Sequence, residues 1–281
     1  MGGALHVKRL LRSWRLWLTG AGLTCLAVLA NFCFTQRAVP LTAGVDSPML
    51  SAVLVTLGGC RGIISEVLWW RIAELQKENR YAELMPLTDL LVSLDPASAD
   101  TWVYNAWNLS YNISAAHHDA AEKWYWVKEG ITLLERGLRA SPRAEPILRQ
   151  LGWTFEDKLG RSADSAASYY RAHLMEIPVP ADAETFATAT GVVSDWNAPE
   201  VRALYWYWRA NHGRDMLRVT LDLVYRLQQT QWVPFLLQVV HHAWDDLAPP
   251  QQEQVRYMLL SIPQTHPSRH AVETFLKEVT P

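Results

Sequence analysis

Three asparagines follow one another at helical spacing in the segment TWVYNAWNLSYNIS, residues 101–114. On a helix, Asn105, Asn108 and Asn112 fall on one face, and Trp107 and Tyr111 flank them. Asparagine is a poor helix former, so three in one stripe need a physical reason. One reason is a polar ladder that grips the extended backbone of a partner. The alternative is that these amides satisfy the loop backbone of the segment that follows, because buried amides must be hydrogen-bonded.

The histidines are the next candidates, since imidazole is a common metal ligand. They include two adjacent pairs, His117–His118 and His241–His242. Neighbouring residues on a helix point about 100° apart, whereas two ligands of one metal are better placed at i and i+4. No acidic residue completes a familiar zinc pattern near either pair, and the three cysteines, Cys25, Cys33 and Cys60, have no zinc spacing. We predict no metal site and no cofactor.

Paired carboxylates could in principle catalyse glycoside hydrolysis, but the two side chains must face each other across a cleft. The pairs Glu156–Asp157 and Asp245–Asp246 are adjacent in sequence and do not by themselves indicate such a cleft. The chain also has no G-x-S-x-G, P-loop or G-x-G-x-x-G motif. We therefore predict that the protein is not an enzyme.

Aromatic residues are unusually frequent, with 14 tryptophans among 281 residues. The run Tyr205–Trp208, YWYW, places aromatic side chains on every side of one helix, which is typical of a helix buried between two neighbours. The alternative is a platform on which a sugar stacks. A net charge of −2 gives no case for a nucleic-acid partner.

The N-terminal region predicts a membrane anchor. Residues 16–34 hold no charge, and as a helix they would extend about 28 Å, close to the thickness of a hydrocarbon core. Four basic residues precede this run and one follows it, so the positive-inside rule puts residues 1–15 in the cytoplasm. The chain from the linker 35–48 onward is then extracytoplasmic. A cleaved signal peptide is the alternative.

The next apolar stretch, LGGCRGIISEVLWWR at Leu57–Arg71, could be a second membrane crossing or the first helix of a water-soluble domain. Arg61 and Glu66 would each cost about 2.5–3.5 kcal/mol at mid-bilayer, which argues against a crossing. We predict a helix whose apolar stripe is spaced by three or four residues. The stripe comprises Leu57, Cys60, Ile64, Leu68 and Ile72. Arg61 and Glu66 then act as capping or buried-pair residues, or face a membrane partner.

Residues 49–178 match the pattern of tetratricopeptide repeats, in which two helices pair in about 34 residues. The best match begins with Leu148, Leu151, Gly152 and Phe155 in a first helix and ends at Pro178. In a second match, WVYNAWNL belongs to the first helix. The second helix follows after an insertion of about twelve residues, AHHDAAEKWYWV. Residues 179–281 are predicted to be degenerate helical repeats and a cap. The fold class predicted is therefore all-α, a transmembrane helix followed by a tetratricopeptide-like solenoid.

Four stretches carry a resemblance to a known family: LGGCRGIISEVLWWRIAELQKENRYAELMPLTDLLVSLDP, WVYNAWNLSYNIS, KWYWVKEGITLLERGLRASPR and LGWTFEDKLG. In combination they resemble a family of bacterial membrane-anchored, tetratricopeptide-like proteins over residues 55–175. The resemblance implies an anchor followed by a solenoid and brings no activity with it. Cys60 and residues 143–146 depart from the family's usual form.

These observations predict a single-pass protein of the bacterial cytoplasmic membrane whose extracytoplasmic helical repeats form a scaffold. Such repeats present long surfaces to other proteins, so we expect partners among envelope or transport proteins. The candidate partner-binding residues are Asn105, Trp107, Asn108, Tyr111 and Asn112, together with Arg61 and Glu66. A module that binds glycans or cell-wall material through exposed aromatic residues is the alternative.

Overall fold

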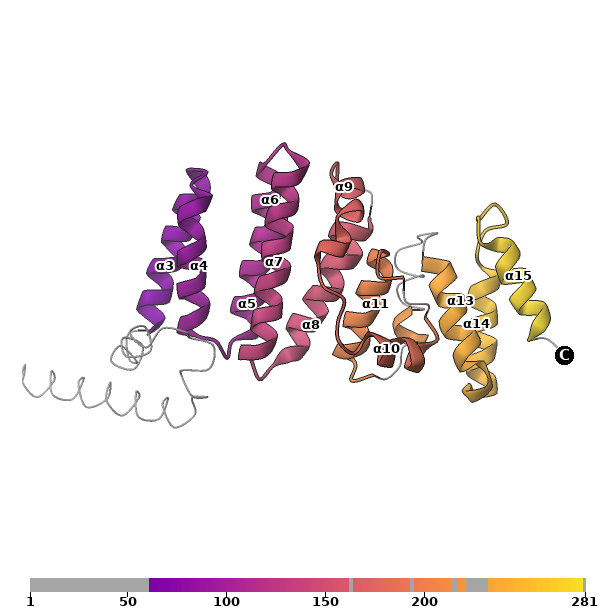
Figure 1. Ribbon diagram of the computed structural model, residues 1–281. Coiled ribbons are helices and arrows are strands. Elements are labelled where there is room, and N and C mark those ends of the chain that lie inside the picture. The colour runs from indigo at the N-terminus through magenta and orange to yellow at the C-terminus, as the bar shows by residue number, and fades with distance from the viewer. Residues whose placement is uncertain (1–60, 162–163, 193–194, 214–216, 221–231, 280–281) are drawn as a thin grey trace, which may run out of the picture. The chain divides into compact units, whose positions relative to one another are not determined.

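The computed structural model describes residues 61–161, 164–192, 195–213, 217–220 and 232–279 (Figure 1). Within these ranges every regular element is a helix and no strand occurs, so the predicted all-α class is confirmed. The chain divides into two compact units between Ala97 and Ser98.

The predicted cytoplasmic segment 1–15, membrane segment 16–34 and linker 35–48 lie outside the described residues. Among the helices that are described, none combines the length and the apolar character that a membrane crossing requires. The stretch Leu57–Arg71 enters the described part of the chain at Arg61 as a helix.

The first unit contains the helices α3 (Arg61–Lys77) and α4 (Tyr81–Leu94), which pack against each other. Asn79 adopts a positive φ of 57° between them, a conformation that asparagine tolerates better than most residues. The predicted stripe on α3 is buried at Leu68 and Ile72, whereas its first members, Leu57 and Cys60, lie outside the described residues.

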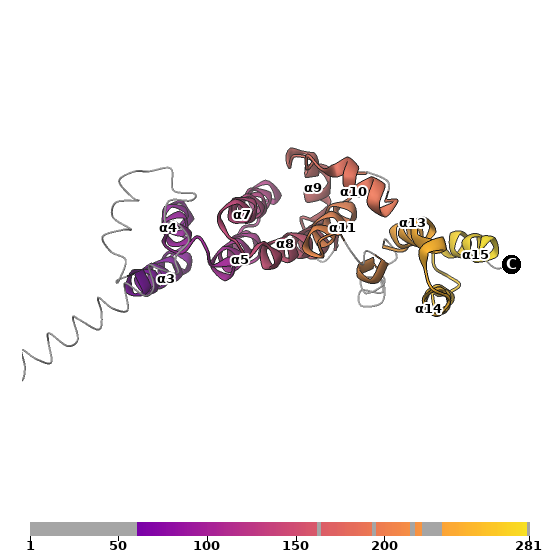
Figure 2. The ribbon, with the colours of Figure 1, turned by 90° about the horizontal axis from the view of Figure 1, so that it is seen from below.

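In the second unit, six helices form two layers (Figure 2). The front layer, toward the viewer in Figure 1, contains α7 (Ala120–Ala140), α9 (Ala167–Ala172) and α10 (Ala183–Thr190). The back layer contains α5 (Ala99–Trp107), α8 (Ala144–Trp153) and α11 (Pro199–Ala210). Because α8 packs against α5, α7 and α11, it connects the two layers at their centre.

Two back-layer helices continue as wider π-helical turns. The helix α5 runs into η2 (Asn108–Ile113) and then α6 (Ser114–Ala116), and α8 runs into η3 (Thr154–Gly160). Each pair therefore forms one longer helical rod with a π-helical part in it.

The twelve-residue segment AHHDAAEKWYWV was interpreted as an insertion between two helices, and that interpretation is wrong. The helix α7 already begins at Ala120, because Asp119 caps it by accepting hydrogen bonds from the amides of Ala121 and Glu122. Trp124 and Trp126 then belong to the buried face of α7, which is why this aromatic-rich segment is helical.

Small residues allow the front and back layers to approach closely. A side chain at Gly130 of α7 would lie 2.7 Å from the carbonyl oxygen of Ala106 on α5. A side chain at Gly137 would lie 2.8 Å from the ring of Trp102. At both glycines the backbone of α7 therefore lies directly against α5, with no room for a side chain between them.

A buried arginine connects α11 to the chain segments before and after α10. The guanidinium of Arg202 on α11 donates hydrogen bonds to the carbonyl oxygens of Trp196, Ile177 and Pro178 at 2.9, 2.9 and 3.3 Å. Burial lowers the pKa of Arg202 to about 10, and the nearby Glu135 partly opposes that shift. The cation therefore fixes the chain on both sides of α10 to α11.

The C-terminal helices of the second unit form a separate core. They are α13 (Val233–Ala243), the 3-10 turn η6 (Trp244–Asp246), α14 (Pro249–Leu260) and α15 (Arg269–Glu278). Their apolar faces converge on one cluster. Its buried members are Val233, Leu236, Val240, Trp244, Val255, Leu259, Ile262, Val272 and Phe275.

We predict that Gly130→Ala lowers the free energy of unfolding by about 1–2 kcal/mol, because overpacking against a backbone carbonyl outweighs the better helix propensity of alanine. Urea unfolding followed by circular dichroism measures the change. Gly62→Ala on α3 is the matched control, since an added side chain there meets nothing within 4 Å. An equal effect of both substitutions would contradict the proposed close packing of α5 and α7.

Candidate functional site

Three aromatic residues form a ladder along one face of α5 and η2. Tyr104, Trp107 and Tyr111 are spaced i, i+3, i+7; the first two rings lie 6.2 Å apart between centroids, and the second two lie 6.0 Å apart and are stacked at 18°. Tyr104 is 52% exposed and Trp107 is 37% exposed, whereas Tyr111 is half-buried. The aromatic ladder is therefore open to solvent at its N-terminal end and anchored at its C-terminal end.

Each of the two π-helical turns begins near a side-chain hydrogen bond to the i−4 carbonyl. Asn105 donates its side-chain amide to the carbonyl of Thr101 at 2.8 Å just before η2. Thr154 at the start of η3 likewise donates its hydroxyl to the carbonyl of Gln150 at 2.8 Å. Such side-chain bonds to the i−4 carbonyl compete with the helix's own hydrogen bonds and bend it. Single π-helical turns inside helices occur frequently at functional sites.

Charged side chains of η3 hold the second turn in place. Lys158 is 8% exposed at its side chain, and its ammonium lies 2.6 Å from the carboxylate of Asp164. Lys123 of α7 lies 3.6 Å from that carboxylate, which also accepts from the hydroxyl of Tyr170 and the amide of Ala166. We call this group the Asp164 network; it connects η3 to α7 and to the start of α9.

The pKa of Asp164 reflects two opposing effects. Burial by itself would raise it, but the hydrogen bond from Lys158, the amide of Ala166 and the charge of Lys123 together bring it below the ordinary value of 3.8. The carboxylate is therefore ionised in the folded chain and stabilises the buried ammonium of Lys158.

A second set of polar groups meets at the end of the ladder. The buried carboxylate of Glu156 accepts a hydrogen bond of 2.6 Å from the hydroxyl of Tyr207 on α11. Arg161 lies 3.0 Å from Asp157 and 3.8 Å from Glu156. Burial first, and then the charge of Asp157, raise the pKa of Tyr111, so its hydroxyl stays protonated. Side chains from α5/η2, α8/η3 and α11 thus converge here.

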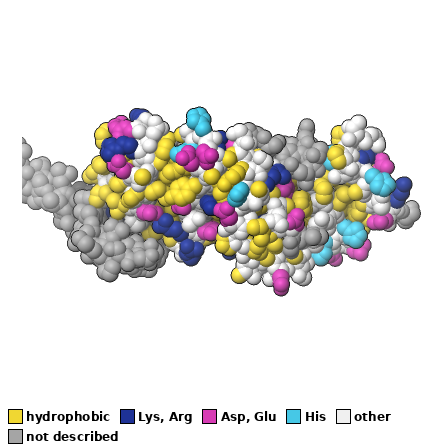
Figure 3. Space-filling view, turned by 45° about the horizontal axis from the view of Figure 1, so that its top comes forward, with side chains coloured by type: hydrophobic (Ala, Val, Ile, Leu, Met, Phe, Trp, Pro, Cys, Tyr) yellow, Lys and Arg dark blue, Asp and Glu magenta, His cyan; other side chains and the backbone are white. Residues whose placement is uncertain are grey.

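This arrangement suits binding through stacking and hydrogen bonds. The open rings of Tyr104 and Trp107 offer flat apolar surface, and the partly exposed Asp157 and Arg161 offer an acceptor and donors beside it. Figure 3 shows Lys and Arg side chains interspersed with Asp and Glu over the face of the molecule that it draws.

The predicted asparagines do not form an exposed polar stripe. Asn105 and Asn108 are 2% and 5% exposed, and Asn108 accepts a hydrogen bond of 2.9 Å from the side chain of the exposed Asn112. Trp107 and Tyr111, which the sequence placed beside them, belong to the aromatic ladder instead. Of the three amides, Asn112 alone is exposed to solvent.

Arg61 and Glu66 belong to the first unit and are not part of the ladder. Both lie on α3, where Arg61 is half-buried and Glu66 is exposed. The prediction that they contact a partner stays a prediction.

Sequence reasoning missed Lys158, Asp164, Arg161 and Tyr207. The sequence indicates Glu156 and Asp157 only as an acidic pair, although the run EDKLGR holds two acidic and two basic residues within six positions, which could have indicated an ionic cluster. Nothing in the sequence indicated that Tyr207 reaches Glu156, because that contact depends on how closely α8 and α11 pack.

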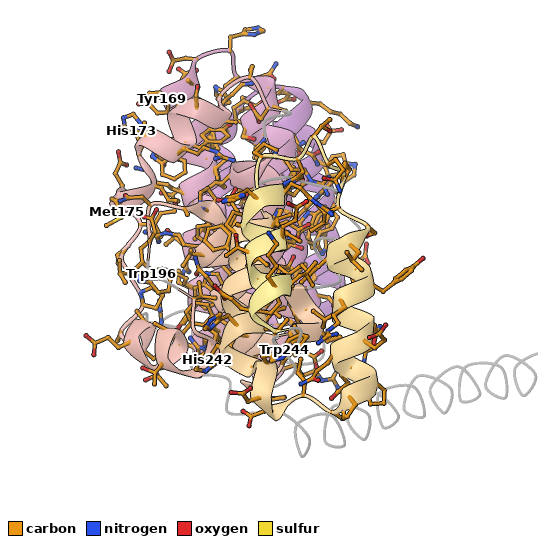
Figure 4. The ribbon with its side chains drawn as sticks, turned by 90° about the vertical axis from the view of Figure 1, so that its right-hand side faces the viewer. Tyr169, His173, Met175, Trp196, His242 and Trp244 are labelled. Atoms are coloured by element: carbon orange, nitrogen blue, oxygen red, sulfur yellow. The ribbon has the colours of Figure 1, made fainter. Side chains whose placement is uncertain are left out.

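The histidine pairs lie apart from the ladder. His117 contacts Glu122 through a 3.0 Å ring-nitrogen contact. His241 and His242 line an open, mostly apolar pocket of about 520 Å³ among α10, α13 and α15, and Figure 4 shows His242 beside the C-terminal end of α10. Across the part of the chain that the structure describes, no group of three or more His, Cys, Asp or Glu residues could hold a metal ion.

No family model, curated protein or solved structure matches this chain. The function is therefore argued from the geometry of the ladder and its surroundings.

We predict that Asp164→Asn lowers the free energy of unfolding by about 3 kcal/mol, because it leaves the buried ammonium of Lys158 without its carboxylate. The contribution of a carboxylate whose pKa is lowered by folding is present above its ordinary value of 3.8 and is lost as the pH falls below it. The variant should accordingly lose less stability than the parent when urea unfolding is repeated at decreasing pH.

Glu145→Gln is the control for Asp164→Asn. It removes an exposed ion pair with Arg149, whose two side chains are 52% and 56% exposed, and should cost less than about 0.5 kcal/mol. If the two substitutions cost the same, the Asp164 network does not hold η3 in place.

Proposed function

We propose that this chain is a non-enzymatic, membrane-anchored scaffold whose extracytoplasmic helical repeats bind partner proteins in an envelope or transport complex. The observation that carries the proposal is the aromatic ladder, which exposes two large rings on a helix held rigid by buried polar contacts. A segment of the partner would lie along Tyr104 and Trp107 and reach Asp157 and Arg161 at the end of the ladder.

The tetratricopeptide-like part of the proposal is supported by packing. Leu148, Leu151 and Phe155, which the repeat pattern assigns to a first helix, are buried on α8 and η3. Tyr170, assigned to the second helix, is fully buried on α9. Close approach of paired helices at Gly130 and Gly137 is what a repeat of helical hairpins requires. The short α9 departs from a regular repeat of this kind.

Aromatic and arginine side chains are a favourable composition for such a surface. Residues that contribute most to protein–protein binding are enriched in Trp, Tyr and Arg. Rigid rings lose little conformational entropy on binding, and the helix that carries them is already formed in the free chain. A partner therefore gains contact area without having to order the ladder.

One observation favours a glycan as the second candidate. The rings of Trp107 and Tyr111 are nearly parallel and lie beside the amide of Asn112 and the carboxylate of Asp157, which could accept or donate hydrogen bonds to hydroxyl groups. Sugar rings stack on aromatic faces in this way.

The membrane anchor in this proposal depends on residues 16–34, which lie outside the described part of the chain.

We predict that the double substitution Tyr104→Ala/Trp107→Ala reduces recovery of a crosslinked partner from native membranes about tenfold or more, since losing two such anchors costs more than about 1.4 kcal/mol. The measurement is quantitative mass spectrometry of proteins that co-purify with the full chain after crosslinking. Tyr257→Ala on α14 is the matched control, because Tyr257 is an exposed ring (76%) far along the sequence from the ladder.

Three results would count against the protein scaffold. The parent chain could purify without any crosslinked partner, the control could lose partners as strongly as the double variant, or the double variant could lose its helical circular dichroism. Quenching of tryptophan fluorescence by cell-wall fragments in the parent chain, abolished by Trp107→Phe, would instead support the glycan-binding function.

A further inference from the structure

The helix α3 carries an apolar stripe that faces away from its buried side. Ile63, Val67 and Trp70 follow one another at i, i+4 and i+7 and are 70%, 59% and 64% exposed. The opposite side of α3 buries Leu68 and Ile72 in the first unit. Single exposed apolar residues need no explanation, whereas a contiguous set of large ones indicates a surface that contacts another molecule or a membrane.

The stripe occupies one half of α3 only. Further along the same face the exposed residues are charged: Glu74 and Lys77 lie 3.8 Å apart, and the side chain of Lys77 is 76% exposed. The face therefore changes from apolar to charged with distance from Arg61, the residue at which the described chain begins.

The sequence that leads into α3 is uncharged, like the stripe. No charged residue occurs in residues 47–60, directly before the stripe. The predicted membrane segment ends at Phe34, and a chain of 26 residues, the length of 35–60, spans at most about 94 Å, so α3 lies within reach of the bilayer to which that segment belongs.

We propose that the first half of α3 lies on the extracytoplasmic surface of the lipid bilayer, with Ile63, Val67 and Trp70 at the boundary between headgroups and acyl chains. This proposal rests on the membrane anchoring proposed above. Tryptophan is enriched at that boundary because its ring is apolar and its N–H can reach water. Glu66 lies beside the stripe and would stay in the headgroup layer, as would the pair Glu74 and Lys77.

A bilayer fits this surface better than a second copy of the chain. A stable protein interface buries about 800 Å² on each partner, which three side chains on one helix do not supply. A helix whose first half lies in the interface, in contrast, needs an apolar face over that half, and the charged residues beyond it stay in water. That is the gradient that α3 shows from Ile63 to Lys77.

The test uses the full chain reconstituted into phosphatidylcholine/phosphatidylglycerol vesicles that contain lipids brominated at carbons 6 and 7. We expect the lipid-dependent quenching of tryptophan fluorescence to fall several-fold more in Trp70→Phe than in Trp69→Phe. Trp69 is the matched control, since it is the adjacent residue on the same helix and is only half-exposed. Equal quenching of the two variants would overturn the proposal.

A photo-crosslinker in place of Val67 identifies what covers the stripe. Lipid adducts on that residue support the proposal, whereas adducts to a second copy, to another protein or to another part of the same chain overturn it. Resistance of the parent chain to alkaline carbonate extraction reports the anchor separately. The two proposals fail separately. If the crosslinked partner is not recovered but Trp70 is still quenched by the brominated lipids, the partner proposal fails alone. If the partner is recovered but Trp70 is not quenched, the lipid proposal fails alone.

Discussion

The packing of Gly152 on α8 against Tyr207 on α11 is the contact on which the candidate site depends. A side chain at Gly152 would come within 2.6 Å of the Tyr207 ring, so any other residue would push the two helices apart. At this separation the Tyr207 hydroxyl donates a 2.6 Å hydrogen bond to the buried carboxylate of Glu156, which also lies 3.8 Å from Arg161. The missing side chain at Gly152 therefore sets the helix separation at which the polar groups at the end of the ladder meet.

The two π-helical turns and the Asp164 network act together on the ladder. The turns widen the helices where Tyr111 and Asp157 meet, and the ion pair of Lys158 with Asp164 holds η3 against α7 and α9. Lys158 also lies 5.3 Å from the Tyr111 ring centre, within the range of a cation–π contact. The C-terminal end of the ladder is thus fixed by charge and by packing, while Tyr104 and Trp107 at the other end remain available.

The helical class and the buried apolar positions on α8 could be predicted because each follows from local periodicity. The burial of YWYW was predicted only in part: Tyr205 and Trp206 are buried, whereas Tyr207 and Trp208 are partly exposed. The asparagine stripe also had the predicted spacing, but spacing does not say which face turns inward. That depends on contacts distant in sequence, such as Gly130 against Ala106, and so do the pairings of Tyr207 with Glu156 and of Lys123 with Asp164.

The way polar and aromatic residues are distributed on α5 and η2 argues for a binding surface. Asn105 and Asn108 are buried, where each amide needs hydrogen-bond partners, while Tyr104 and Trp107 on the same rod are exposed. Ordinary stability would favour the opposite, with rings inside and amides in water. The α3 stripe shows a similar surplus of exposed apolar surface in the first unit. A chain that keeps such surfaces in contact with water loses the free energy that burial would supply, which is the physical reason for proposing a partner for the ladder and a lipid surface for the α3 stripe.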